Sequence, residues 1–140
     1  MRTILYILIA VGLISSCSND STPSTAVTSS FEKMFPTATK VTWEKEDKNE
    51  WESEFLLDGN KVEAKFAEDG TWVKTERDIQ IADLPKAVAD SIKMQYLDWE
   101  ITEAEKNEST KHGIIYKADL KKGLMKKDVK YTENGLEAAD

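Results

Sequence analysis

Residues 51–66 read WESEFLLDGNKVEAKF, two runs of alternating polar and apolar residues joined by Asp58-Gly59. Asp-Gly is a preferred dipeptide for the type I′ turn of a two-residue β-hairpin. Because the side chains of a strand alternate between its two faces, this turn places the aromatic residues of both runs on one face and leaves the other face charged. The predicted cross-strand pairs are Trp51 with Phe66, Ser53 with Ala64 and Phe55 with Val62 on the apolar face, and Glu52 with Lys65 and Glu54 with Glu63 on the charged face. The last of these pairs opposes two like charges and is mildly unfavourable.

A second hairpin is predicted for residues 114–131, with Lys122-Gly123 as its turn. This turn again separates an apolar face from a charged one, and it opposes charges of unlike sign on the charged face. The predicted pairs are Ile114 with Tyr131, Tyr116 with Val129 and Leu120 with Met125, and on the charged face Lys117 with Asp128 and Asp119 with Lys126. Lys127 then falls opposite Ala118 on the apolar face, so we expect either a lysine that extends to solvent at a sheet edge or a β-bulge.

The two hairpins belong to two copies of an internal sequence repeat. Gly70 corresponds to Gly135 at an offset of 65 positions, whereas Phe35 corresponds to Tyr96 at a shorter offset, so the second copy has extra residues, which we place at 106–111. Each copy is predicted to contain a helix and about four antiparallel strands. The copies span about residues 31–80 and 81–140 and together form one domain at 31–140.

A helix is predicted between the hairpins, in residues 83–96, DLPKAVADSIKMQY. Its apolar stripe is Leu84, Val88, Ile92 and Tyr96. This stripe is typical of a helix that lies on a sheet, and Asp83 is the expected N-cap before Pro85. A shorter helix at about 28–34 takes this part in the first copy. We therefore expect an α+β tandem repeat whose helices cover one face of the sheet and whose other face is open.

The first 16 residues are typical of a secretory signal peptide, with Arg2, an apolar run at 4–14 and the small pair Ser15-Ser16. The run is shorter than the roughly 20 apolar residues of a membrane span. Ile14-Ser15-Ser16-Cys17 resembles the lipobox of bacterial lipoproteins, in which the cysteine is acylated. The alternative is an ordinary thiol beside a signal peptide that is cut elsewhere.

Residues 17–30 are predicted to be the anchor cysteine and a flexible tether rich in Ser and Thr. We expect an exported, membrane-anchored lipoprotein, in the outer membrane facing the periplasm or on the cell surface. No other cysteine is present, so the domain is stabilised by its core and not by disulfides.

The chain has 19 Lys and Arg against 26 Asp and Glu, a formal net charge of -7. An acidic surface repels phosphate groups, so nucleic acid is not an expected partner, and we expect contact with the membrane through the lipid anchor only.

The residues do not indicate an enzyme. The only histidine, His112, lies in a polar loop, and no second histidine or free cysteine exists to form a zinc site. Glu52 and Glu54 resemble a hydrolytic carboxylate pair, but alternating Glu and Lys on a strand is typical of a solvated face. Asp58-Gly59-Asn60 lacks the spaced oxygen ligands of a calcium loop. We predict no metal and no cofactor.

Three segments resemble the PepSY-like, or beta-lactamase-inhibitor-protein-like (BLIP-like), family of small exported bacterial proteins. They are FEKMFPTATKVTW at 31–43, DGNKVEAKFAEDGTW at 58–72, and DLPKAVADSIKMQY at 83–96 with the later YKADL. The resemblance implies a tandem repeat with a helix-backed antiparallel sheet. In the inhibitor members the concave sheet face binds a partner protein, and the family implies no cofactor and no known catalysis.

The leading hypothesis is a non-enzymatic lipoprotein that binds a protein or peptide in the cell envelope through its open sheet face. The alternative is an inhibitor that occludes the active site of an envelope protease or hydrolase; a carboxylate-based hydrolase or a small-ligand carrier is less favoured. Trp72 is expected to pair with Ala67, to point away from Phe66, and so to lie at the rim of the open face as an interface anchor. The other residues predicted for this face are Glu52, Glu54, Lys61, Glu63, Lys65, Lys117, Asp119, Lys126, Asp128 and Lys130.

Overall fold

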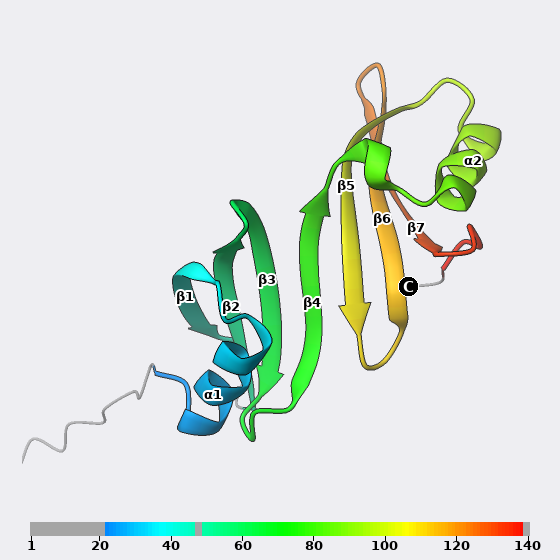
Figure 1. The fold of residues 1–140 in the computed structure, drawn as a ribbon. Helices are drawn as coiled ribbons and strands as arrows, with labels where there is room; N and C mark the ends of the chain where they lie inside the picture. The colour runs from blue at the N-terminus through cyan, green and yellow to red at the C-terminus, as the bar shows by residue number, and fades with distance from the viewer. Residues whose placement is uncertain (1–21, 47–48, 139–140) are drawn as a thin grey trace, which may run out of the picture.

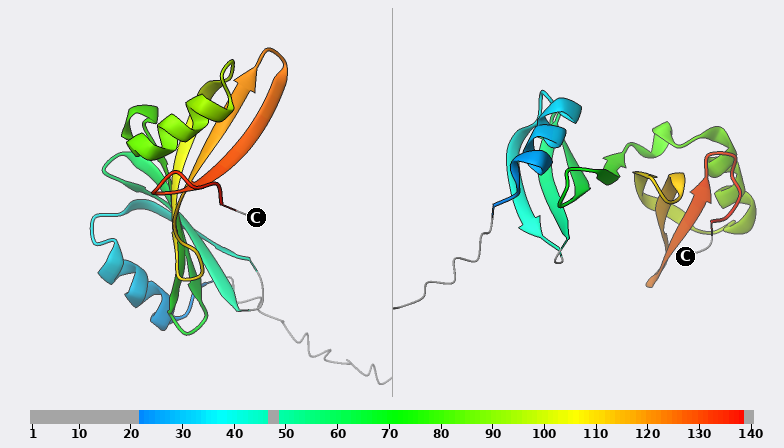
Figure 2. Two further views of the ribbon diagram at one scale, coloured as in Figure 1. Left: turned by 90° about the vertical axis from the view of Figure 1, so that its right-hand side faces the viewer. Right: turned by 90° about the horizontal axis from the view of Figure 1, so that it is seen from below.

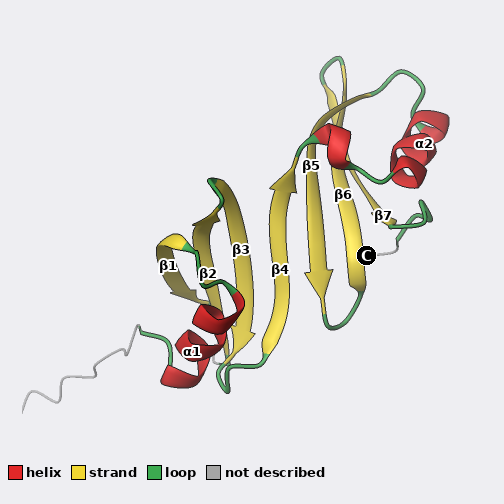
Figure 3. Ribbon diagram, viewed as in Figure 1, coloured by secondary structure: helices red, strands yellow, loops and turns green. Residues whose placement is uncertain are grey.

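The computed structural model describes residues 22–46 and 49–138, which form an α+β fold (Figure 1). Seven antiparallel strands make one open sheet in the order β1-β2-β3-β4-β5-β6-β7, so every strand pairs with its neighbour in the chain. The elements are α1 (Thr25–Met34), β1 (Thr39–Lys45), β2 (Glu50–Leu57), β3 (Asn60–Ala67), β4 (Trp72–Ile79), the 3-10 turn η1 (Ile81–Asp83), α2 (Lys86–Gln95), β5 (Glu100–Ser109), β6 (Gly113–Lys122) and β7 (Met125–Thr132). Figure 3 separates the helices, strands and loops by colour.

The first hairpin has the predicted register. Trp51 pairs with Phe66 and Phe55 with Val62, and the turn lies at Asp58-Gly59. Both turn residues have positive φ, 51° at Asp58 and 84° at Gly59, as a type I′ turn requires. The register predicted from the Asp-Gly dipeptide is therefore confirmed.

The predicted register of the second hairpin is wrong. Its turn is Gly123-Leu124 and not Lys122-Gly123. Lys122 lies outside the turn and pairs with Met125. Gly123 has φ +61° and occupies the first turn position, the position that a type II′ turn reserves for glycine. The observed pairs are Tyr116 with Tyr131, Lys117 with Lys130, Ala118 with Val129, Asp119 with Asp128, Leu120 with Lys127 and Lys121 with Lys126. The partners move by two residues, an even number, so every side chain keeps its predicted face.

The two halves of the chain do not have equal strand numbers. Four strands precede α2, as predicted, but three follow it. In place of a fourth strand, the end of the chain makes one isolated bridge between Tyr131 and Glu137.

The folded part begins earlier than residue 31. Ser24 caps α1 by accepting a hydrogen bond from the Val27 amide at 3.3 Å, and its hydroxyl donates to the Glu68 carbonyl at 3.0 Å. The predicted tether is therefore wrong from Ser24 onward. The predicted signal peptide and Cys17 lie outside the described residues.

The second helix also begins differently from the prediction. Asp83 belongs to η1 and does not cap α2; Pro85 takes the N-cap position, without a side-chain hydrogen bond. The fixed φ of proline is compatible with the start of a helix.

Two separate hydrophobic clusters stabilise the fold, one under each helix. The cluster at α1 contains Val27, Phe31, Trp51, Phe55, Val62, Ala64 and Phe66. The cluster at α2 contains Leu84, Val88, Ile92, Ala104, Tyr116, Ala118, Leu120, Val129 and Tyr131. Figure 2 shows α1 beside the first strands and α2 beside the last ones, with the twisted sheet running between them. All of these core residues lie between residues 27 and 131, so a chain of residues 18–140 carries both cores complete.

Each helix approaches a sheet turn closely at a glycine. A Cβ on Gly70 would lie 2.5 Å from the Ala26 carbonyl oxygen, and one on Gly135 would lie 2.5 Å from the Ala87 carbonyl oxygen. The Ser91 hydroxyl donates to the Gly135 carbonyl at 2.7 Å. Both glycines have positive φ, so backbone conformation and space exclude a side chain at the same points.

We predict that Gly70→Ala destabilises the protein much more than Gly59→Ala. The two glycines have almost the same φ, +86° and +84°, but a Cβ on Gly59 would meet nothing within 4 Å. Gly59→Ala should therefore cost only the left-handed strain of about 1–2 kcal/mol, while Gly70→Ala adds an overpacking cost of about 1–3 kcal/mol. Urea unfolding of residues 18–140 measures both, and equal losses would contradict this helix–turn contact.

Candidate functional site

The polar side chains of β2, β3, β6 and β7 alternate with the core residues and point away from them. They include every residue predicted for the open face except Trp72. Together with three residues of β4 and β5, they form the surface that we call the charged face. Its members are Glu52, Glu54, Lys61, Glu63, Lys65, Lys74, Glu76, Glu105, Lys117, Asp119, Lys126, Asp128 and Lys130.

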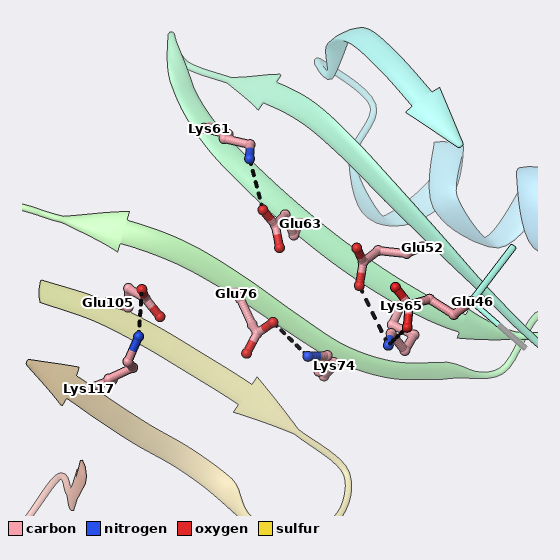
Figure 4. A network of polar contacts seen from close by, with 9 residues as sticks. All are labelled: Glu46, Glu52, Lys61, Glu63, Lys65, Lys74, Glu76, Glu105 and Lys117. Carbon is pink, nitrogen blue, oxygen red and sulfur yellow. Dashed lines mark hydrogen bonds and ion pairs between the residues drawn. The ribbon is translucent and has the colours of Figure 1, made fainter. Parts of the chain in front are cut away.

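Among the ion-paired lysines of the charged face, Lys65 has the least exposed side chain. Only 14 % of its side chain is exposed, and its Nζ lies 3.2 Å from Glu46 Oε2 and 3.5 Å from Glu52 Oε2 (Figure 4). Burial lowers the pKa of Lys65, but the hydrogen bond and the attraction to Glu46 and Glu52 outweigh burial and raise it above the ordinary value. Burial also raises the pKa of Glu52, against the opposing effect of Lys65. The ammonium and the two carboxylates therefore hold one another in fixed positions.

Lys61 offsets the one like-charge repulsion in the first hairpin. Glu54 and Glu63 face each other, as predicted, but the Lys61 Nζ lies 3.4 Å from Glu54 Oε2 and 3.0 Å from Glu63 Oε1. The hydrogen bond and attraction to Glu63 raise the pKa of Lys61. Since about half of the Lys61 side chain is exposed, this bridge contributes little to stability.

Strands β4 and β5 complete the charged face, and sequence reasoning missed their residues. Lys74 Nζ lies 2.6 Å from Glu76 Oε2 on β4, and Lys117 Nζ lies 3.3 Å from Glu105 Oε1 across β5 and β6 (Figure 4). Burial lowers the pKa of Lys117, but attraction to Glu105 and Asp119 outweighs burial and raises it. The alternation of Lys74, Glu76 and Asp78 in the sequence was the available signal, but the β5 residues that pair with them lie far along the chain, at 105–109.

A shallow hollow lies in the middle of the charged face, where β3, β4 and β5 run side by side. Its volume is about 140 Å³, and it is lined by Lys61, Glu63, Glu76, Arg77, Asp78 and Glu105. The lining is mostly acidic. The face therefore carries an excess of negative charge on β2–β5, whereas lysines outnumber acidic residues on its β6–β7 part.

Trp72 does not lie where it was predicted. It pairs with Phe66 and not with Ala67, because a register shift between Lys65 and Phe66 reverses the side chain. Trp72 packs against the α1 cluster, and its indole N–H donates to Thr75 Oγ1 at 2.9 Å. It is therefore not part of the charged face. Trp99 likewise packs against the α2 cluster.

Catalytic groups do not gather in the described part of the chain. No group of three or more His, Cys, Asp or Glu side chains there has an arrangement that could hold a metal ion. His112 is exposed in the turn between β5 and β6. Within residues 22–46 and 49–138, no helix is long and apolar enough to cross a membrane.

Comparison with known proteins agrees with this fold. A family sequence model described as "Putative beta-lactamase-inhibitor-like, PepSY-like" matches residues 50–136, more than half of the chain. The chain belongs to this PepSY-like (BLIP-like) family, as its sequence motifs indicated. A search of curated proteins found no match.

Solved structures with the same fold come from several Bacteroides species. A BLIP-like protein from Bacteroides fragilis has 24% sequence identity and a TM-score of 0.74 over 84% of this chain and 84% of that chain. A DUF2874 family protein from Bacteroides ovatus has 25% identity and a TM-score of 0.74 over 84% and 86% of the two chains. A protein from Bacteroides eggerthii, named as one of the "putative periplasmic proteins", has 21% identity and a TM-score of 0.75 over 84% and 87%.

We predict that Lys65→Met destabilises the protein by about 1–2 kcal/mol, between the values of an exposed ion pair and of a hydrogen bond to a charged group. Because the pKa of Lys65 is raised in the folded state, its stabilisation is fully present below the unfolded value of 10.5 and is lost as pH rises through the folded value. Urea unfolding of wild type and Lys65→Met should therefore differ at pH 7 and converge well above pH 10.5. Lys61→Met is the matched control, and it should change stability little. An equal loss in both variants would contradict this account of Lys65.

Proposed function

We propose that this protein is a non-enzymatic binding module of the cell envelope that engages a protein or peptide through its charged face. One observation carries the proposal: charges on the β2–β3 and β5–β6 parts of this face are held in place by ion pairs that join neighbouring strands. Lys65 joins β2 and β3, and Lys117 joins β5 and β6. A surface whose side chains are already ordered loses less conformational entropy on binding, so its recognition is more favourable.

The charge distribution indicates what kind of partner fits. The β2–β5 part has an acidic excess, and the β6–β7 part a basic one. Complementary potentials accelerate association and select the orientation of a partner. A fitting protein or peptide presents a basic region to β2–β5 and an acidic region to β6–β7.

We also propose that the chain is a tandem repeat whose two helices cover one face and leave the charged face open. The sheet register supports this. On β4, Thr75 pairs with Ala64 of the α1 cluster, and Ile79 pairs with Ala104 of the α2 cluster. Residues four apart on a strand share a face, so both cores occupy the same side. The equal 2.5 Å approaches at Gly70 and Gly135 support two copies of one unit.

A second candidate is inhibition of an envelope protease or hydrolase by active-site occlusion. The family description and the fold likeness to a BLIP-like protein favour it. An inhibitor slows its target in a rate assay, whereas an adaptor leaves the rate unchanged. A carboxylate hydrolase is disfavoured, since Lys65 neutralises Glu52 and Lys61 neutralises Glu54.

The proposed localisation is the cell envelope. The chain is exported and anchored through acylated Cys17 in the outer membrane, facing the periplasm or the cell surface. The signal-like first 16 residues support export, as does the likeness to a solved structure named periplasmic.

We predict that reversing charges on the charged face abolishes capture of the partner. Glu54→Lys with Asp78→Lys alters two exposed acidic positions, one on β2 and one in the lining of the hollow on β4. Glu32→Lys with Glu133→Lys is the matched control, with the same change in net charge at exposed positions on α1 and after β7. Crosslinking in the native envelope should recover a partner with wild type and the control but not with the charged-face variant. Identical partners for all three would refute binding through this face.

We predict that acyl labelling depends on Cys17. Cells that express wild type should incorporate a labelled fatty acid into the protein, and cells that express Cys17→Ser should not, because the thiol is the acceptor in the lipobox reaction. Label retained by the variant would exclude this anchor.

A further inference from the structure

The hairpin of β6 and β7 ends in a cluster of lysines around two apolar residues. Residues 121–127 read KKGLMKK, with two lysines on each side of Gly123-Leu124-Met125 and no acidic residue. Lys126 belongs to the charged face and its partner Lys121 lies on the same side of the sheet, whereas Lys122 and Lys127 lie on the helix side of the hairpin. The tip is therefore surrounded by positive charge in a chain whose net charge is -7.

The apolar residues at this tip are not used by the fold. Leu124 is fully exposed, at 102 %, and Met125 is 55 % exposed. Gly123 supplies the positive φ of the turn, so the backbone does not require a leucine at the next position. An apolar side chain that folding leaves in water gains free energy only when another surface removes it from water.

A third apolar residue lies beside the tip. Leu97, in the loop after α2, is 84 % exposed, and its two neighbours in the chain both contact the hairpin. Lys127 Nζ lies 5.3 Å from the ring centre of Tyr96, and Lys122 Nζ lies 2.9 Å from Asp98 Oδ2. The views in Figures 1 and 2 both place this loop and the tip at the same end of the molecule. Leu97 therefore lies at the same end of the molecule as Leu124 and Met125, and we call these three residues the apolar tip.

Lys121 and Lys126 are arranged unfavourably for folding. They face each other directly across the hairpin. Glu100 of β5 is the other neighbour of Lys121 in the sheet, but no ion pair of either lysine is found among the described residues. Directly opposed like charges destabilise a hairpin. An external anionic surface would relieve this repulsion.

We propose that the apolar tip and its lysines bind an anionic lipid bilayer at its surface. Apolar side chains that enter the boundary between headgroups and acyl chains, ringed by lysines that contact anionic headgroups, are the features of interfacial binding. Each lysine near an anionic membrane surface strengthens binding about fivefold. The acidic charges of β2–β5 do not prevent this contact, because charges beyond about 8–10 Å are screened at physiological salt. This contact adds to any anchor at Cys17 and does not require one.

The test uses residues 18–140, which contain both cores and no cysteine. We expect this chain to sediment with vesicles of phosphatidylethanolamine and phosphatidylglycerol, and to remain in the supernatant with phosphatidylcholine alone or at high salt. Lys121→Gln with Lys126→Gln should weaken binding about 25-fold, while the free energy of unfolding stays equal or rises because the repulsion is removed. Leu124→Asn should also weaken binding. Absence of binding to the anionic vesicles, or unchanged binding by these variants, would overturn the proposal.

A site-specific label identifies the part that enters the bilayer. Leu124→Cys introduces the only cysteine of residues 18–140, and a polarity-sensitive dye on it should shift to shorter wavelengths with anionic vesicles. Asn60→Cys, at the exposed tip of the β2–β3 hairpin, is the matched control and should show no shift. Equal shifts at both tips would indicate nonspecific adsorption and would refute the assignment to the apolar tip.

Discussion

The pairing of β4 with β5 is the interaction on which the rest of the structure depends. The two hydrophobic clusters are separate, and the ladder from Lys74–Ser109 to Ile79–Ala104 joins the strands that carry them. The same ladder brings Glu76 of the first half beside residues of the second half. Without it, the charged face would be two small surfaces, each backed by one helix.

The local parts of this fold follow from the sequence, and the reason is turn chemistry. Asp58-Gly59 specified one hairpin completely, since both positions of a type I′ turn accept these residues. In the second hairpin the sequence places Gly123 at the second turn position, but it occupies the first. The predicted register of β6 and β7 is therefore wrong. The opposite-charge pairs that favoured the wrong register were misleading, because such exposed pairs contribute only tenths of a kcal/mol. The face of each residue was nevertheless correct, since alternation is preserved by an even shift.

The candidate site was predicted where it depends on one hairpin and missed where it depends on distant strands. Glu52 and Lys65 pair as expected, but the register alone did not show that Glu46 also approaches Lys65. Trp72 was misplaced because one shift in the β3–β4 ladder moves it to the opposite face. Such a bulge inserts one extra residue into one strand, and the alternation of a single strand does not reveal it.

The charge distribution connects the two proposals. Negative charge is concentrated on β2–β5, and the lysine-rich tip belongs to β6 and β7 at the other edge of the sheet. An anionic bilayer attracts the tip and repels the β2–β5 part, so both forces orient the domain in the same sense. A domain held by its apolar tip would then present its acidic surface to the aqueous phase, where a partner with a basic region can reach it. The hollow lined by Glu63, Glu76 and Glu105 would be accessible in this orientation. Binding at the tip and binding at the acidic part of the charged face are therefore compatible in one molecule, because the tip is the end of the β6–β7 hairpin, whereas the acidic part lies on β2–β5 and has the opposite charge.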